Sequence, residues 1–215
     1  MGAAIYWFSK MELASVSQPV GNMTTAPIAG SGTAGQTFVV PCRGLYRVDV
    51  YFAAYDQADA PEVVFHLRDS PTSDHDLARV VRAPAPIVWA DYQTFEFAPI
   101  ADSAGQHYYF YFRSKNADAT SASSIWANGD DVYPDGERFI SIQPGSGDLV
   151  FRAYCRLDWA SKADLLLGRL AAGKPLILGE KKFYIVLFGV YAVVLTLFLD
   201  QLGQHALSGE EERSQ

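Results

Sequence analysis

Apolar and polar residues alternate one by one in several short stretches between residues 35 and 157. In residues 45–52, LYRVDVYF, the charged side chains of Arg47 and Asp49 separate apolar positions. Alternation of this kind predicts β-strands that bury one side and expose the other. The other expected strands are short apolar or alternating runs at 36–40, 62–68, 77–82, 86–90, 92–97, 107–113, 122–127, 137–142 and 148–156. With no helical stretch among them, these runs predict an all-β domain, an antiparallel β-sandwich over residues 35–157.

The longest apolar run lies near the C-terminus, at residues 183–199, FYIVLFGVYAVVLTLFL. As a helix this uncharged run is about 26 Å long, and with residues 200–202 it reaches the roughly 30 Å of a bilayer's hydrocarbon core. Two lysines precede it and Asp200 follows it, so that charge flanks the run on both sides. We therefore expect a single C-terminal transmembrane helix over residues 181–202. A buried core helix or a pair of strands is the alternative, because the run is rich in β-branched residues.

Small residues share one face of this expected helix. Gly189, Ala192 and Thr196 are spaced three and four residues apart. Small side chains let a second helix approach closely, so this stripe predicts a helix-packing face. The alternative is that Gly and Ala are frequent in any membrane helix. No ionisable side chain interrupts residues 183–199, which argues against transport or proton relay by this helix alone.

Three further segments flank the expected sandwich and helix. Residues 1–34 contain a stretch rich in Ser, Thr, Gly, Ala and Pro and are expected to form an N-terminal arm or linker. Residues 158–180 are expected to form an amphipathic juxtamembrane segment with a short helix at 161–172. This helix either lies on the membrane or packs on the open end of the sandwich. Residues 203–215 are expected to be an acidic, disordered tail.

Composition narrows the classes of function. Of the 215 residues, 13% are aromatic and 19% are charged, and the formal net charge is −7. A long disordered chain is excluded, because such chains are poor in aromatic residues. The acidic balance argues against a nucleic-acid partner, because nucleic-acid modules carry basic patches.

Several aromatic residues lie near the ends of expected strands, where they are candidates for stacking on a sugar or contacting a protein. These are Trp89, Tyr92, Trp126 and Tyr133. The alternative is that they pack in the core or in an interface, where aromatic residues are common. Tyr109 and Tyr111 fall on the outer face of their expected strand, which suggests that the domain meets a partner.

The sequence contains no recognisable catalytic pattern. The four histidines lack a second His or Cys at metal-ligand spacing, and there is no nucleophile elbow, phosphate-binding loop or dinucleotide fingerprint. We therefore expect no catalytic residues, no cofactor and no enzyme activity. The loop at 128–137 is the better of two candidates for Ca²⁺, the other being the acidic loop with Asp69, Asp74 and Asp76. It would bind through carboxylate oxygens, although its spacing does not fit an EF-hand and ordinary turn chemistry is the alternative. Its carboxylates are Asp130, Asp131, Asp135 and Glu137.

Two cysteines, Cys42 and Cys155, follow the first expected strand and end the last one. First and last strands of a sandwich are often neighbours, so a disulfide between them is geometrically feasible. Such a bond would indicate an oxidising compartment. Two buried free thiols are the alternative.

A set of strand and turn motifs extends over a little over half of the chain: GQTF (35–38), GLYRVDVYFA (44–53), VVFHLRDSP (63–71), FEFAPIADSAGQHYYFYFRS (95–114), VYPDGE (132–137) and GDLVFRAYCR (147–156). With these motifs the stretch resembles a jelly-roll-like extracytoplasmic β domain. Such domains are found beside transmembrane segments in bacterial membrane proteins, including some glycosyltransferase-like proteins. The resemblance implies a fold and a place in the membrane, without an active site. With one expected span and no catalytic membrane domain, glycosyl transfer by this chain alone is not expected.

Two functions follow as expectations. The first is a non-catalytic single-pass accessory or scaffold subunit, whose β-sandwich docks on a larger respiratory, photosynthetic or envelope-assembly membrane complex. The second is a membrane-anchored carbohydrate-binding module. The expected partners are membrane protein subunits and the lipid bilayer. Basic residues before the span favour a cytoplasmic β domain by the positive-inside tendency, whereas the resemblance and a disulfide favour the extracytoplasmic side, which we prefer.

Overall fold

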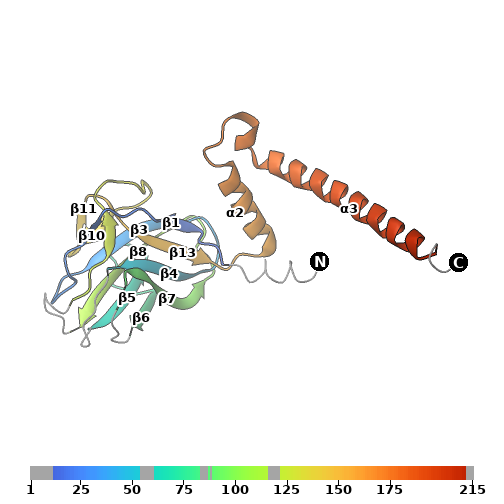
Figure 1. The fold of residues 1–215 in the computed structure, drawn as a ribbon. Coiled ribbons are helices and arrows are strands. Elements are labelled where there is room, and N and C mark those ends of the chain that lie inside the picture. Colours follow the sequence, from blue (N-terminus) through green and yellow to red (C-terminus); the bar gives the residue numbers. More distant parts are fainter. Residues whose placement is uncertain (1–11, 54–60, 83–86, 88, 116–121, 212–215) are drawn as a thin grey trace. The chain divides into compact units, whose positions relative to one another are not determined.

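The computed structural model describes residues 12–53, 61–82, 87, 89–115 and 122–211. The chain divides into two units, one ending at Asp158 and one beginning at Trp159 (Figure 1). The first unit is rich in strands, and the second is helical.

The strands of the first unit form three antiparallel sheets. In spatial order, the first sheet contains β1 (Val16–Gln18), β13 (Phe151–Cys155), β4 (Leu45–Phe52) and β7 (Asp91–Ile100). The second contains β11 (Gln143–Gly145), β10 (Arg138–Ile140), β3 (Ala34–Val40), β8 (Gln106–Lys115), β5 (Glu62–Arg68) and β6 (Ala78–Arg82). A small third sheet contains β12 (Asp148–Leu149), β9 (Trp126–Asn128) and β2 (Met23–Thr24). The prediction of antiparallel sheets from alternation is therefore confirmed.

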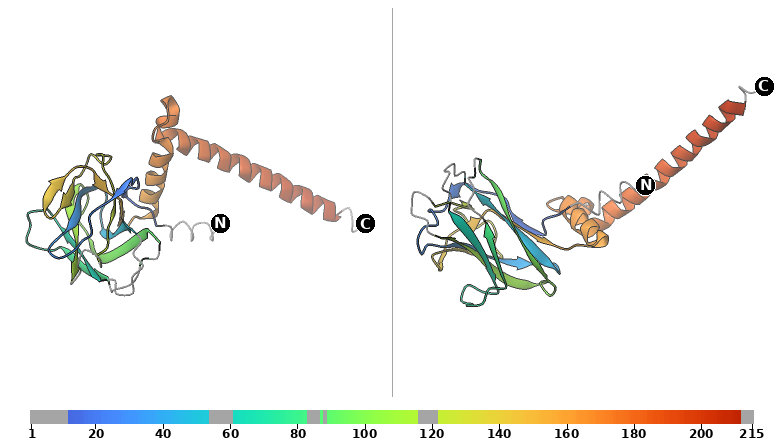
Figure 2. Two further views of the ribbon diagram at one scale, coloured as in Figure 1. Left: turned by 60° about the vertical axis from the view of Figure 1, so that its left-hand side comes forward. Right: turned by 90° about the horizontal axis from the view of Figure 1, so that it is seen from below.

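Aromatic side chains fill the space between the first two sheets, which form the layers visible in Figure 2. Phe38 of β3 contacts Phe151 of β13, with ring centroids 5.6 Å apart. Phe112 of β8 meets Phe52 of β4 edge-on at 5.3 Å. All four rings are fully buried, as the alternation of their strands requires. The two sheets thus share one core, in a sandwich-like arrangement.

Cys42 and Cys155 are joined by a disulfide. Cys42 follows β3 of the second sheet, and Cys155 ends β13 of the first sheet. The bond therefore ties the two layers together covalently. It closes a loop that contains nearly all the strands of the unit, since the two cysteines are separated by 113 positions.

Part of the segment expected to be a linker is built into the sheets. β1 pairs with β13 through Val16 opposite Ala153, and β2 pairs with β9. Val16 and Ile28 are buried in the core. The sequence did not predict these strands, because the segment is rich in small residues and a short edge strand needs only one or two apolar side chains.

Two other expected strands also differ from the structure. The run at 122–127 forms a strand only at Trp126–Asn128. The run at 86–90 falls partly outside the described residues. It forms no named strand in the part that is described.

The outer tyrosines of β8 are covered by the domain itself. Tyr109 and Tyr111 are only 2% and 5% exposed and cluster with Phe139 of β10. Tyr109 meets Phe139 edge-on at 5.3 Å across β3. Gly35 of β3 permits this contact, because a Cβ there would lie 2.7 Å from the Tyr109 ring. These tyrosines therefore give no support to a partner surface, which corrects the inference from their outward position.

The second unit contains α2 (Trp159–Ala171), a short 3₁₀ helix η1 (Leu176–Gly179) and α3 (Lys181–Glu211). Within it, the Lys181 ammonium lies 2.7 Å from a carboxylate oxygen of Asp164, and the Tyr184 hydroxyl donates to the carbonyl of Leu170. These contacts join the start of α3 to α2. The helix of α3 continues to Glu211, so the first part of the expected tail is helical.

The segment Lys181–Leu202 of α3 is long and apolar enough to cross a membrane, with a mean hydropathy of 2.2. It is the one such helix among the described residues. Its large apolar side chains are exposed. The prediction of one C-terminal apolar helix of spanning length is thereby confirmed.

Candidate functional site

A groove of about 410 Å³ lies on the outer face of the first sheet, at the end of β4 nearest the third sheet. The alternation of β4 explains it: Val48, Val50 and Phe52 face the core, which leaves Tyr51 on the outside. The lining residues come from the first sheet, from β9 of the third sheet and from the segments that connect their strands: Pro19, Gly21, Tyr51, Tyr92, Trp126, Val150 and Arg152.

Three aromatic rings and one guanidinium form the groove. Tyr51 stands opposite Tyr92 of β7 in the strand register, and their ring centroids are 4.8 Å apart. The ring of Trp126 lies 6.3 Å from Tyr51. Arg152 of β13 places its guanidinium carbon 3.9 Å from the centre of the Tyr92 ring, in a cation–π contact. Burial raises the pKa of Tyr92, so its hydroxyl stays protonated at neutral pH.

The indole N–H of Trp126 has no hydrogen-bond partner in the described structure, although it is buried. A buried donor without a partner costs free energy, on the order of 1–3 kcal/mol. A ligand oxygen that reached this donor would recover part of that cost. The groove itself offers ring faces and a guanidinium, an apolar lining with a polar group as in ligand sites.

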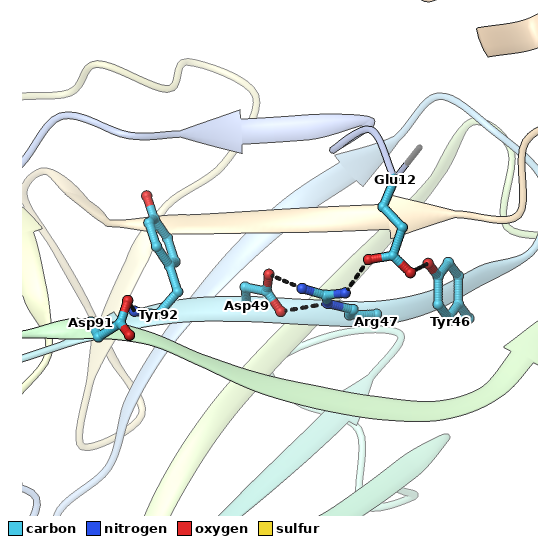
Figure 3. A network of polar contacts seen from close by, with 6 residues as sticks. All are labelled: Glu12, Tyr46, Arg47, Asp49, Asp91 and Tyr92. Atoms are coloured by element: carbon cyan, nitrogen blue, oxygen red, sulfur yellow. Dashed lines mark hydrogen bonds and ion pairs between the residues drawn. The ribbon is translucent and has the colours of Figure 1, made fainter. Parts of the chain in front are cut away.

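A chain of polar contacts continues along the same face of the sheet (Figure 3). The guanidinium of Arg47 donates twice to the Asp49 carboxylate, at 2.7 Å each, and a third time to Glu12. The hydroxyl of Tyr46 donates to the other oxygen of Glu12. The hydrogen bonds with Asp49 raise the pKa of Arg47 above its usual range. Tyr92 projects from the same side of the sheet. The groove and this row of polar contacts therefore share one continuous polar and aromatic face.

The structure brings together only two of the four aromatic residues singled out from the sequence. Tyr92 and Trp126 line the groove. Trp89 is 81% exposed and lies outside it. Tyr133 turns inward: its ring meets Phe151 edge-on, and its hydroxyl accepts a hydrogen bond from the backbone N–H of Val39.

Two groove residues, Tyr51 and Arg152, were not selected from the sequence. The signal was present, because both occupy positions of the alternation that face away from the core. What the sequence did not show is that β4, β7 and β13 are neighbours, which places the two residues beside each other.

The acidic loop at 128–137 is ordered by a different carboxylate. Asp148 is fully buried and accepts hydrogen bonds from the backbone N–H groups of Val132 and Tyr133 and from the Gln36 amide. No group of three or more potential metal ligands is found among the described residues. The four carboxylates proposed for Ca²⁺ are exposed and are not gathered into such a group: Asp130, Asp131, Asp135 and Glu137.

The small residues of α3 are exposed along the helix. The hydroxyl of Thr196 donates to the carbonyl of Ala192 at 2.8 Å, which satisfies it within the helix. A Cβ added at Gly189 would meet nothing within 4 Å. The stripe stays a prediction of a helix-packing face.

Taken together, the described geometry offers a binding groove on the first sheet and an exposed apolar helix. Comparison with protein-family models and with curated proteins finds no match for this chain.

Proposed function

We propose that this protein is a non-catalytic, single-pass membrane accessory subunit, whose jelly-roll-like β domain docks on a larger membrane complex. The observation that carries the proposal is the exposed apolar surface of α3. Ile185, Phe188, Tyr191 and Leu197 are each more than half exposed, and they lie on different sides of the helix. A helix that is apolar on all sides requires either a protein core or a bilayer around it.

The cost of leaving this helix in water is large. Burying one Val, Leu, Ile or Phe side chain is worth about 1.5–3 kcal/mol, and α3 exposes more than ten of them. Lys181 and Lys182 at one end and Asp200 at the other suit the headgroup regions, where charged side chains reach water. Membrane insertion followed by contact with partner helices along Gly189 and Ala192 removes this cost.

The disulfide supports an extracytoplasmic location of the β domain. Disulfides persist in oxidising compartments and are rare in the cytosol. The Cys42–Cys155 bond therefore favours the outer side over the cytoplasmic side indicated by the basic residues before the span.

We expect the full chain, extracted from its native membrane in mild detergent, to migrate well above the 23.6 kDa of one copy. Enlarging the small-residue face by Gly189→Leu with Ala192→Leu should release most of the chain from that assembly, because partner helices can no longer approach closely. Val194→Leu, on another side of the helix, is the matched control and should leave the assembly intact. Native mass spectrometry measures all three proteins.

Carbonate extraction separates anchoring from docking in the same experiment. Both variants should stay in the membrane fraction, because leucine preserves the apolar span. A lone monomer at native expression would contradict the accessory-subunit proposal. Release of the unaltered chain by carbonate would contradict the membrane anchor.

The aromatic groove favours carbohydrate binding as a second function. Sugars present flat C–H faces to aromatic rings and hydroxyl oxygens to donors, and the groove offers the rings of Tyr51, Tyr92 and Trp126 and the guanidinium of Arg152. We propose the groove as the sugar-binding site of a membrane-anchored module. This function is compatible with membrane anchoring and requires only the β domain.

Truncating the groove should abolish sugar binding without unfolding the domain. For a glycan identified by array screening of the full chain in detergent, Trp126→Ala and Tyr51→Ala should each raise the dissociation constant at least tenfold, because each removes a stacking face. Trp89→Ala, an exposed tryptophan outside the groove, is the control and should bind normally. Calorimetric titration measures the constants. No binding at millimolar glycan, or equal loss in the control, would contradict this function.

A further inference from the structure

A second pocket, of about 470 Å³, lies on the opposite side of the β domain, on the outer face of the second sheet. It forms where β6, β5 and β8 run side by side. Val64 lies among its lining residues and is 5% exposed. The polar lining comes from His66, Arg79, Arg113 and Ser114, with Gly30 and Ser31 at one edge.

The strand register gathers the basic residues. Phe65 of β5 is in the core, so its neighbours Val64 and His66 face outward. His66 stands directly opposite Arg79 of β6, and Val64 stands directly opposite Arg113 of β8. Directly paired side chains on one face of a sheet have Cβ atoms about 5 Å apart. Arg79 is thus directly beside His66, and Arg113 lies diagonally across on the other neighbouring strand.

Two neighbours, Asp76 and Tyr111, fix the orientation of His66. Its Nδ1 lies 2.6 Å from a carboxylate oxygen of Asp76. Its ring stacks on Tyr111 with centroids 4.5 Å apart and planes 6° from parallel. Asp76 is itself held by the guanidinium of Arg68 at 2.7 Å. Because Asp76 occupies Nδ1, Nε2 is the ring nitrogen left to meet a ligand.

Among the described residues, ion pairs do not balance the positive charge of Arg79 and Arg113 in this pocket. Asp76 is shared by His66 and Arg68. The ion pairs found in the described part of the chain do not include Arg79 or Arg113. Two guanidinium groups on one face, outside the ion pairs of the described residues, form a site suited to an anion.

We propose that this pocket binds the phosphate or sulfate group of a monoester, with Arg79 and Arg113 as the anion-binding residues and His66 as a third donor. Guanidinium groups recognise such oxyanions by paired hydrogen bonds. The pocket volume leaves room for part of the organic group that carries the anion. The ester is either a free small molecule or a lipid headgroup, and the experiment below distinguishes these sources. The inference holds whether or not the domain docks on a complex.

Because His66 is one of the donors, the affinity of the pocket for an anion is expected to depend on pH. Burial lowers the pKa of His66, and Arg79 and Arg113 lower it further, whereas the hydrogen bond with Asp76 opposes them. The other groups around the ring are Arg68, held by Asp76, and Tyr111, which stays protonated because burial raises its pKa. A bound dianion would favour the imidazolium. Binding should therefore tighten as pH falls through the pKa of His66, and a bound anion should raise that pKa by the same linkage.

Sulfate is the first probe, because it remains a dianion across the titration range of histidine. With the full chain in detergent, titration calorimetry should show saturable binding, and Arg79→Gln and Arg113→Gln should each weaken it about tenfold or more. Arg43→Gln is the matched control, since Arg43 is an exposed arginine of the same domain, paired with Asp102. It should bind sulfate as the unaltered protein does. Nuclear magnetic resonance of the His66 ring should show its pKa rise with sulfate.

The source of the ester is tested with two further probes. Tighter binding of glycerol 3-phosphate than of sulfate indicates a free monoester. Tighter binding of short-chain phosphatidic acid than of phosphatidylcholine in mixed micelles, without a response to glycerol 3-phosphate, indicates a lipid headgroup. Absence of sulfate binding at tens of millimolar, equal weakening by Arg43→Gln, or a His66 pKa indifferent to sulfate would overturn the proposal. The measurement of the His66 pKa uses the unaltered protein, so it tests the proposal even if a variant fails to fold.

Discussion

Reduction of the disulfide between Cys42 and Cys155 is expected to lower the free energy of unfolding of the β domain by roughly 4–5 kcal/mol. The reason is the length of the closed loop. A separation of 113 positions restricts the unfolded chain strongly, and the loop-closure model assigns about 4.7 kcal/mol to a loop of roughly 100 residues. A loss of this size is a large share of the 5–15 kcal/mol that stabilises an ordinary domain.

Urea unfolding of the full chain in detergent measures this effect. Near-ultraviolet circular dichroism should follow the tertiary packing of the β domain, while the helical content of α3 leaves that signal largely unaffected. The double variant Cys42→Ala with Cys155→Ala should unfold at the same urea concentration as the reduced protein, because both lack the same constraint. An unfolding midpoint that is unchanged by reductant would show that the bond contributes nothing to stability.

Replacing Phe65 by alanine is expected to cost about 3–5 kcal/mol, the range for removing a buried phenylalanine. The Phe65 ring is fully buried and stacks against Phe95 at 5.1 Å. It also meets Phe110 and Phe112 at 6.0 and 5.6 Å. The cavity left by the ring would border aromatic side chains from both sheets, and rigid rings collapse poorly into such a space.

Two companion variants make this result specific. Phe65→Leu keeps most of the apolar volume and should cost clearly less than Phe65→Ala. Trp89→Ala removes an aromatic ring that is 81% exposed and should change the free energy of unfolding by no more than about 0.5 kcal/mol. The same urea titration compares the three proteins. A cost for Phe65→Ala no larger than that for Trp89→Ala would show that the ring does not belong to a packed core.

Strand positions were largely predictable because alternation is a local property. The run 45–52 coincides with β4, and the run 62–68 coincides with β5. In β5, side-chain parity correctly separates core from outer positions. In β4 it holds from Val48 to Phe52, but a register shift between Leu45 and Arg47 puts Leu45 in the core in place of Tyr46. The short strands β1 and β2 were not predictable, because their hydrogen bonds to β13 and β9 hold them in place without an apolar pattern of their own.

Only part of the candidate groove could be predicted from the sequence. Trp126 and Tyr92 are aromatic residues near expected strand ends, and composition alone draws attention to them. Their assembly with Tyr51 and Arg152 depends on the spatial order β13–β4–β7, which no local pattern encodes. Strand order also explains Tyr109. Its outward position predicted a partner contact, but Phe139 of β10 covers it.

The sequence by itself determined the antiparallel β-rich class, the side-chain parity of the main strands and the apolar helix, because periodicity and hydrophobicity act within single segments. Only the tertiary structure decided which strands are neighbours, that Cys42 and Cys155 are joined, and which polar residues share a pocket. These features arise from contacts between segments far apart in the chain. In a β domain, the binding surfaces are therefore harder to predict from the sequence than the core, since each surface is assembled from several strands.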